Sequence, residues 1–318
     1  MKKVILGKTG LSVSVCGFGV LPMGPAQLAL PVAEGASIIR HALDHGINFL
    51  DTAQYYRTYP YIKEALAGGS YDDVVICSKS LESDYDGMMQ AIHEAREELG
   101  RDVIDIFLMH EVRSGQLKER SGAWQALVDA RESGLVRAIG LSTHHVDVTA
   151  AAASMEQLDV VFPLINYAGL GIRRGNAFAT ADEMMEAIRL CHDAGKGIFS
   201  MKAFGGGALT AHYQEALDYV FDASCIDSVM VGFGKISDVV DMLSYLDGTM
   251  DASYQPDVSA KRVHVNQEDC EGCGACKNAC PAGAIYWGDN GLAAVDHDKC
   301  LTCGYCSPVC PVRAVIMY

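Results

Sequence analysis

Eight of the twelve cysteines of this chain form a run that occurs twice, thirty residues apart. In each copy two residues separate the first three cysteines, three residues precede the fourth, and a proline follows, Pro281 or Pro311. Such spacing is typical of two [4Fe-4S] clusters, because three close thiolates cap one face of a cubane while the fourth cysteine reaches the other cluster. We therefore expect one cluster on Cys270, Cys273, Cys276 and Cys310, and a second on Cys300, Cys303, Cys306 and Cys280.

Two zinc sites are the alternative for these cysteines. A zinc site usually takes two Cys-x2-Cys pairs around one tetrahedral ion, rather than a triple followed by Cys-Pro. The neighbouring residues are small, as at Gly272, Gly274 and Ala275, and small side chains let backbone N–H groups approach cluster sulfur. From Arg262 to Tyr318 the segment resembles the dicluster bacterial ferredoxins over its whole length.

Length and charge limit what the other residues do. The 318 residues suit one barrel plus a small second domain. A net charge of −15 without a basic stripe speaks against a nucleic-acid partner, and no apolar run reaches the roughly 18 residues that span a membrane. Twelve cysteines without a secretion signal indicate metal rather than disulfides, and with oxygen-sensitive clusters they predict a cytoplasmic protein. Four lone cysteines are expected to be buried: Cys16, Cys77, Cys191 and Cys225.

Short apolar runs alternate with amphipathic segments upstream of the cysteines. Repeated eight times over about 250 residues, this alternation predicts an α/β fold, a (β/α)8 TIM barrel, with a doubly wound open sheet as the alternative. The predicted strands are Val13–Gly19, Asn48–Asp51, Val74–Lys79, Ile104–His110, Ala138–Thr143, Val160–Tyr167, Gly197–Phe204 and Ser228–Gly232. A hairpin over Val4–Val13 is expected to close the barrel floor. We divide the chain into a barrel at 1–246, a polar linker at 247–261 and a ferredoxin-like dicluster domain at 262–318.

Ionisable residues end three neighbouring strands of the predicted barrel. Asp51, Lys79 and His110 stand at the carboxyl ends of strands two, three and four, where barrel enzymes place their chemistry. Tyr56 follows strand two, and Tyr55 beside it is its rival. An ammonium near a tyrosine favours the phenolate and lowers the pKa of the hydroxyl, so Lys79 would make Tyr56 a better proton donor.

These residues carry a resemblance to a known family. The segment GINFLDTAQYY resembles the DTAxxY stretch of the aldo-keto reductases, VVICSKS and DIFLMHE are similar to their lysine and histidine strands, and GKTGLSVS is similar to their opening. The resemblance covers roughly residues 1 to 246. It implies a catalytic tetrad of Asp51, Tyr56, Lys79 and His110, in which Tyr56 protonates the carbonyl oxygen, Asp51 holds Lys79, and His110 orients the substrate.

The same resemblance implies NADPH or NADH across the top of the barrel. The matching positions are Ser142 at the end of strand five, Asn166 at the end of strand six, and Met201 and Lys202 on strand seven. The family more often has an asparagine directly after the serine, a glutamine at the position of Asn166, and an aromatic ring on strand seven. After strand eight, a helix start with Gly232, Gly234, Lys235 and Ser237 is expected to bind phosphate. This window has no arginine, and Asp238 would repel a 2′-phosphate. Arg173 and Arg174 are interpreted as a solvated loop pair, or alternatively as an anion contact.

Two functions follow from these patterns. The first is an iron–sulfur oxidoreductase that reduces a small carbonyl substrate with NAD(P)H. A hydride carries two electrons and a cluster accepts one, so either a flavin or a flavoprotein partner intervenes, or the clusters serve a separate path with a redox protein. The second is an electron-transfer or docking protein whose barrel no longer binds nicotinamide. Clusters that only stabilise the fold are a third interpretation.

Overall fold

The barrel strands are short and largely apolar, and two neighbouring ones are buried on both faces. β5 (Val75–Ser80) and β6 (Ile104–Met109) are buried along their whole length, as expected for parallel strands covered by helices outside and side chains inside. The computed structural model describes residues 1–257, 262–267, 269–302, 304–312 and 314–317. The other barrel strands are β3 (Cys16–Gly19), β4 (Phe49–Asp51), β7 (Val136–Thr143), β8 (Val160–Pro163), β11 (Gly197–Ser200) and β12 (Ser228–Gly232).

The eight strands close into a parallel barrel in the order β11-β12-β3-β4-β5-β6-β7-β8. β12 pairs with β3 over four residues, from Val229 opposite Cys16 to Gly232 opposite Gly19, so the sheet has no open edge. The predicted TIM barrel is confirmed and the open doubly wound sheet is excluded. Gly140 in β7 is required, because a Cβ there would lie 1.9 Å from the carbonyl oxygen of Val160 in β8.

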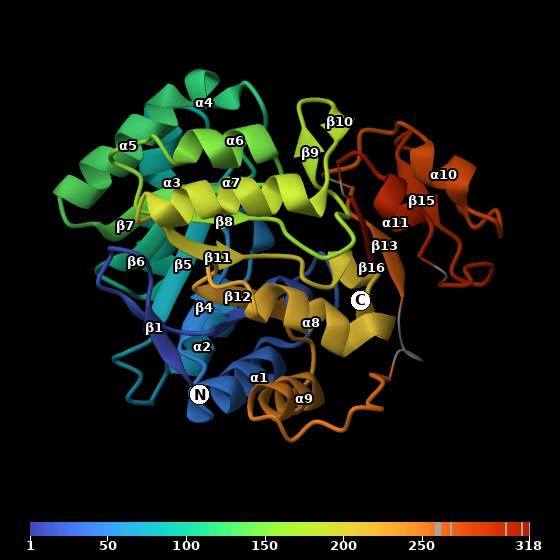
Figure 1. Ribbon diagram of the computed structural model, residues 1–318, viewed down its shortest axis with the longest axis horizontal. Helices are drawn as coiled ribbons and strands as arrows, with labels where there is room; N and C mark the ends of the chain where they lie inside the picture. Colours follow the sequence, from blue (N-terminus) through green and yellow to red (C-terminus); the bar gives the residue numbers. More distant parts are fainter. Residues whose placement is uncertain (258–261, 268, 303, 313, 318) are drawn as a thin grey trace.

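Eight helices alternate with the strands and cover the outside of the barrel (Figure 1). They are α1 (Val32–Asp44), α2 (Tyr59–Leu66), α3 (Tyr85–Leu99), α5 (Ser121–Glu132), α6 (Val146–Ala152), α7 (Ala181–Asp193), α8 (Tyr213–Phe221) and α9 (Ile236–Leu246). A further short helix is α4 (Gln116–Glu119), and the 3-10 turns are η1 (Leu21–Met23), η2 (Gln54–Tyr56), η3 (Gly205–Gly207) and η4 (Thr210–His212). Within the described residues, no helix combines the length and apolar character that crossing a bilayer requires.

An N-terminal hairpin lies at the floor of the barrel, as predicted. β1 (Lys3–Ile5) pairs antiparallel with β2 (Ser12–Ser14), so the predicted first strand is divided between this hairpin and β3. Leu6, Leu11 and Val13 join the apolar interior formed by inward side chains of the barrel strands. The strands predicted to end at Tyr167 and Phe204 end earlier, at Pro163 and Ser200.

The cluster domain forms a separate lobe beside the barrel (Figure 1). It contains β13 (Val263–Val265), α10 (Ala275–Ala279), β14 (Ile285–Trp287), β15 (Ala293–Val295), α11 (Cys306–Val309) and β16 (Val315–Met317). β13 pairs with β16 and β14 with β15, both antiparallel. Between the barrel and this lobe, residues 247–257 contain no helix or strand, and the side chain of Tyr254 packs on Tyr213 of α8.

Candidate active site and cluster sites

The four tetrad residues predicted from the sequence lie together at the carboxyl end of the barrel. Asp51 ends β4, Lys79 lies in β5, His110 follows β6, and Tyr56 ends η2. Parallel pairing in register brings the strand ends to the same level, with Asp51 opposite Cys77 and Lys79 opposite Leu108. The barrel thus converts positions far apart in the sequence into one group of side chains.

Lys79 is the centre of this group. Its Nζ lies 3.0 Å from the Asp51 carboxylate, 2.7 Å from the Thr52 carbonyl oxygen and 3.5 Å from the Tyr56 hydroxyl. The Tyr56 hydroxyl lies 3.3 Å from Nε2 of His110. Tyr55 is placed differently, because its hydroxyl bonds Asn266 of the cluster domain. Tyr56, and not Tyr55, therefore contacts both Lys79 and His110.

The buried ion pair sets the electrostatics of the site. Burial disfavours the charge on Lys79, but Asp51 and Tyr56 more than compensate and raise its pKa. Burial raises the pKa of Tyr56 to about 12, and Lys79 opposes that rise without cancelling it. The sequence predicted a lowered pKa for Tyr56. The difference arises because desolvation of a buried phenolate outweighs one neighbouring ammonium.

His110 is held neutral. Burial, and then the charges of Lys79, Arg120 and Lys202, keep its pKa well below the ordinary value. Arg120, at the start of α5, is buried and donates to the carbonyl oxygens of His110 and Ser80, so it ties together the ends of β5 and β6. Sequence reasoning missed this residue, because an arginine on a helical segment gives no sign that it reaches a strand end.

These shifts predict the pH dependence of turnover. Tyr56, the predicted proton donor, keeps its proton below its raised pKa, and His110 stays uncharged above its lowered one, so neither group titrates near neutral pH. We expect kcat for carbonyl reduction to be level from about pH 7 to about pH 10. Steady-state kinetics across this range are the measurement. A step in kcat near the ordinary histidine pKa, absent in His110→Gln, would contradict the neutral imidazole.

A cleft opens above the tetrad, and three of the predicted nicotinamide contacts line it. Ser142, Met201 and Lys202 border the cleft together with Tyr56 and His110. Ser142 also accepts a hydrogen bond of 2.8 Å from the backbone N–H of Glu111. Lys202 and Glu111 have positive φ angles of 62° and 49°, a strained conformation for residues with side chains that is found mainly at functional sites.

Asn166 lies outside this cleft. It is fully buried, its amide nitrogen donates to the Leu170 carbonyl oxygen at 3.0 Å, and its amide oxygen accepts from the Leu170 N–H at 2.9 Å. Both ends of its side-chain amide therefore hold the loop after β8. In this conformation Asn166 does not offer the carboxamide contact that the sequence predicts for it.

The predicted phosphate site at the start of α9 is already used by a carboxylate. Gly232, Lys235 and Ser237 are exposed and Gly234 is partly so. Oδ2 of Asp238 accepts hydrogen bonds from the N–H groups of Gly234 at 3.0 Å and Lys235 at 3.1 Å. These are the donors that a phosphate would require. An anion that uses these two N–H groups can bind only after the Asp238 side chain turns away.

Arg174 is exposed to solvent, as the sequence favoured, whereas Arg173 is half-buried. Both lie in β9 (Arg173–Arg174), which pairs with β10 (Ala177–Phe178). Arg173 stacks over the ring of Phe178, and Arg174 makes an exposed ion pair with Glu183 at 3.2 Å. The four lone cysteines, Cys16, Cys77, Cys191 and Cys225, are all buried, as expected for small apolar side chains.

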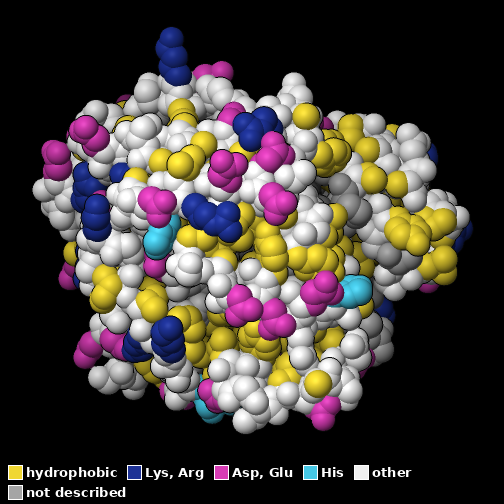
Figure 2. Space-filling model, viewed as in Figure 1, with side chains coloured by type: hydrophobic (Ala, Val, Ile, Leu, Met, Phe, Trp, Pro, Cys, Tyr) yellow, Lys and Arg dark blue, Asp and Glu magenta, His cyan; other side chains and the backbone are white. Residues whose placement is uncertain are grey.

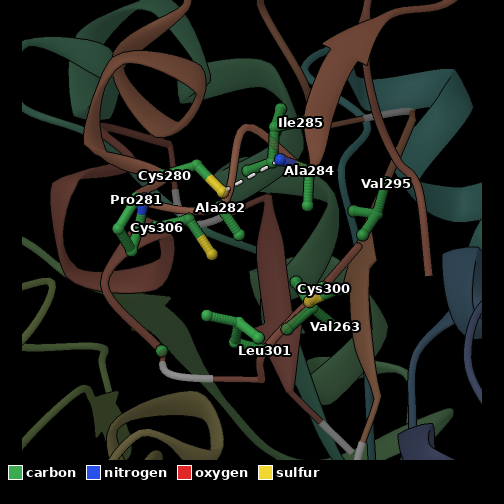
Figure 3. Close-up of a pocket in the computed structure, with 11 residues that line it drawn as sticks. Val263, Cys280, Pro281, Ala282, Ala284, Ile285, Val295, Cys300, Leu301 and Cys306 are labelled. Carbon is green, nitrogen blue, oxygen red and sulfur yellow. Dashed lines mark hydrogen bonds between the residues drawn. The ribbon is translucent and has the colours of Figure 1, made fainter. Parts of the chain in front are cut away.

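Three of the four cysteines predicted to hold the second cluster line one cavity (Figure 3). Cys280, Cys300 and Cys306 line it, with the apolar side chains of Val263 and Leu301, whereas Cys303 lies outside the described residues. Backbone N–H groups already approach two of the sulfur atoms: Ala284 N lies 3.3 Å from Cys280 Sγ and Thr302 N lies 3.4 Å from Cys300 Sγ. These features fit a [4Fe-4S] cluster, whose sulfur ligands accept such bonds.

The cysteines predicted for the first cluster are also close together. Burial raises the pKa of the Cys276 thiol, and Cys310, Cys270 and Cys273 raise it further. Cys310, although it ends the second run, thus lies near Cys276 of the first run, as the predicted ligand set requires. Among described residues, no three His, Cys, Asp or Glu side chains converge as the ligands of a single ion would. The cysteine ligands of a [4Fe-4S] cubane bind around its outside, so they do not converge on one point as the ligands of a single ion do.

Comparisons with known proteins agree with this architecture. The aldo/keto reductase family model matches residues 17–247, and a 4Fe-4S dicluster domain matches residues 258–317. The chain is 26% identical over 221 residues to L-galactose dehydrogenase of Arabidopsis thaliana, covering 64% of this chain and 66% of that protein. It is 28% identical over 192 residues to methylglyoxal reductase DkgA of Yersinia pestis, covering 57% and 66%. The chain thus spans about two thirds of the length of these curated relatives.

A solved structure shows the same barrel. The aldo-keto reductase AKR11C1 of Bacillus halodurans superposes with a TM-score of 0.64 at 17% identity, covering 81% of this chain and 93% of that one. At this identity the likeness establishes the fold alone. The family model, which covers most of the chain, goes further: the protein belongs to the aldo/keto reductase family and carries a 4Fe-4S dicluster domain after its barrel.

Proposed function

We propose that the protein is an iron–sulfur oxidoreductase that reduces a small carbonyl substrate in the cleft above Tyr56. The observation that carries this proposal is the contact of the Tyr56 hydroxyl with both Lys79 and His110 beneath an open cleft. The named activities of relatives, such as L-galactose dehydrogenase and methylglyoxal reductase, support a carbonyl or alcohol substrate.

The residues have separate roles in this proposal. Negative charge builds on the carbonyl oxygen as the carbon is reduced, and the Tyr56 hydroxyl gives it a proton. The Lys79 ammonium, held by Asp51, stabilises the phenolate that remains. Neutral His110 donates a hydrogen bond that orients the carbonyl. Asp51 keeps Lys79 charged in a buried place where an unpaired ammonium would be costly.

A nicotinamide supplies a hydride when it is bound, and the site fits it in part. Ser142, Met201 and Lys202 line the cleft, which supports a contact of these residues with the ring end. The phosphate end fits at Gly234 and Lys235 only if the Asp238 carboxylate releases the backbone N–H groups of these two residues. Each of the two clusters we propose accepts or gives one electron, which suits a redox protein or flavoprotein as partner.

Nucleotide choice tests this proposal. We expect anaerobic calorimetry to show tighter binding of NADH than of NADPH, because the Asp238 carboxylate repels an additional phosphate. Asp238→Asn removes that charge and should strengthen NADPH binding by roughly tenfold, which is about the effect of one removed charge repulsion near a helix start. Asp247→Asn, at the other end of α9, removes the same charge far from the site and should change neither affinity.

A second candidate function has its own observation. A nicotinamide nucleotide would need the side-chain amide of Asn166 and the N–H groups at the start of α9. The amide of Asn166 is bonded to Leu170, and the N–H group of Gly234 is bonded to Asp238. If neither nucleotide binds the native protein or Asp238→Asn, the barrel serves as a platform for electron transfer between the clusters and a partner protein. Turnover of a carbonyl with NADH or NADPH that Tyr56→Phe stops would exclude this second function.

A further inference from the structure

One residue of the cluster domain connects the barrel mouth to a predicted cluster ligand. Asn266 follows β13, and its Nδ2 donates to the Tyr55 hydroxyl at 2.8 Å and to Oδ2 of Asp269 at 2.8 Å. Its backbone carbonyl accepts a hydrogen bond of 3.1 Å from the N–H of Cys270. A short chain of hydrogen bonds thus runs from the loop that carries Tyr56 to the start of the first cysteine run.

The cluster domain also forms one wall of the substrate cleft. Asn266, Asp269, Val312 and Ile316 line the same cleft as Tyr56. Val312 and Ile316 add an apolar surface, whereas Asp269 adds a carboxylate. The charge of Asp269 contributes to the raised pKa of Tyr56, after the larger effects of burial, Lys79 and Asp51. It also raises the pKa of Glu111, again after burial.

The approach of the two domains is close and specific. Gly207 in η3 has a φ of +91°, and a Cβ there would lie 2.3 Å from the carbonyl oxygen of Met317 in β16. Only glycine permits this distance between the loop after β11 and the last strand of the cluster domain. Arg113 and Glu271 add an ion pair at 3.3 Å, which is exposed and contributes little. The buried contacts at Asn266 therefore define the junction.

We propose that the cluster domain is part of the substrate site: Asp269 accepts a hydrogen bond from a polar group of the substrate, and Asn266 positions the Tyr55–Tyr56 turn. This inference rests on the proposed carbonyl reduction. Asp269 directly precedes Cys270, and Cys310 comes two residues before Val312. Both arms of the proposed first cluster thus border the cleft. Asp269 is the chain neighbour of Cys270, so we expect a substrate that contacts Asp269 to alter the environment of this cluster, and the state of the cluster to alter substrate binding equally.

Two aldehydes test the contact at Asp269. Glyceraldehyde is propanal with two hydroxyl groups, so the pair differs only in hydrogen-bonding groups. Asp269→Asn should lower kcat/KM for glyceraldehyde by roughly tenfold, mainly through KM, and that for propanal by less than about twofold, because a hydrogen bond to a charged acceptor is lost. Glu271→Gln removes a neighbouring exposed carboxylate and should change neither value.

The linkage to the cluster has a spectroscopic test. Saturating glyceraldehyde should change the EPR spectrum of one reduced cluster and leave the other unchanged, and Asp269→Asn should abolish that change. Asn266→Ala and Tyr55→Phe both remove the hydrogen bonds between Asn266 and Tyr55, and Asn266→Ala also removes the one to Asp269. Each should lower kcat, and the double variant should be no worse than Asn266→Ala alone.

The outcomes separate this inference from the proposed function. Tyr56→Phe should stop turnover of both aldehydes but preserve the EPR response, whereas retained turnover would reject the proposed function alone. Equal effects of Asp269→Asn on the two aldehydes, or unaltered spectra of both clusters with glyceraldehyde, would overturn the inference. If the native protein reduces neither aldehyde, the EPR titration with glyceraldehyde still tests the contact at Asp269, because it requires binding and not turnover.

Discussion

Replacing Tyr56 by phenylalanine should lower kcat for carbonyl reduction by about a thousandfold, which is within the range for loss of a general acid. The substitution removes one oxygen atom, and with it the only group that contacts both Lys79 and His110 among the described contacts of these side chains. The ring remains to pack against His110, at a centroid distance of 5.4 Å. Turnover should fall, whereas the visible absorption of the clusters should not change.

Tyr71→Phe is the matched control. It removes a hydroxyl that bonds Asp44 on the outer face of the barrel at 3.0 Å. Its kcat should equal that of the native protein. If Tyr56→Phe retains more than about a tenth of the native kcat, another group supplies the proton, because lost general acid catalysis costs at least a hundredfold.

Replacing Cys310 by serine should remove about half of the protein-bound iron, since one of two four-iron clusters loses a ligand. The affected cluster should be that of Cys270, Cys273 and Cys276, because Cys310 lies near enough to Cys276 to raise the pKa of its thiol. Iron analysis and EPR after anaerobic reconstitution are the measurements. Cys191 is a buried cysteine whose thiol donates to the Thr149 carbonyl oxygen. As the control, Cys191→Ser should leave the iron content unchanged.

Double variants show which cluster Cys310 serves. If Cys310 and Cys273 hold the same cluster, their double variant should contain as much iron as either single variant. The double variant of Cys310 and Cys300 should lose nearly all iron, since both clusters are then damaged. The reverse pattern would mean that each cysteine run holds its own cluster, contrary to the crossed arrangement.

The barrel and its strand-end residues could be predicted because they depend on local patterns. Alternating apolar and amphipathic segments require strands and helices, and closing the barrel then brings Asp51, Lys79 and His110 to one end. Cysteine spacing likewise predicts a dicluster domain, which the family model confirms at residues 258–317. The division of the eight cysteines between two clusters stays a prediction. For the barrel residues, one regular element fixes the position of each side chain.

Contacts between distant segments could not be predicted. Nothing in the spacing of residues 247–261 indicates that Asn266 reaches Tyr55 or that Asp269 borders the cleft. The roles of Asn166 and Asp238 depend on side-chain orientation, since each could face a ligand or its own loop. The pKa of Tyr56 depends on the extent of burial, which the sequence does not specify.

The pairing of β13 with β16 has a consequence for how such proteins arise. His264 lies opposite Ile316, so the first and last strands of the cluster domain are neighbours. A domain whose entry and exit adjoin can be joined to a host by a single connection or inserted into a loop with little disturbance. Permuting the strand order of this lobe is therefore compatible with its fold, whereas transfer to another barrel would also require contacts such as those of Gly207 with Met317. A single recombination event can add such a cluster domain to another protein.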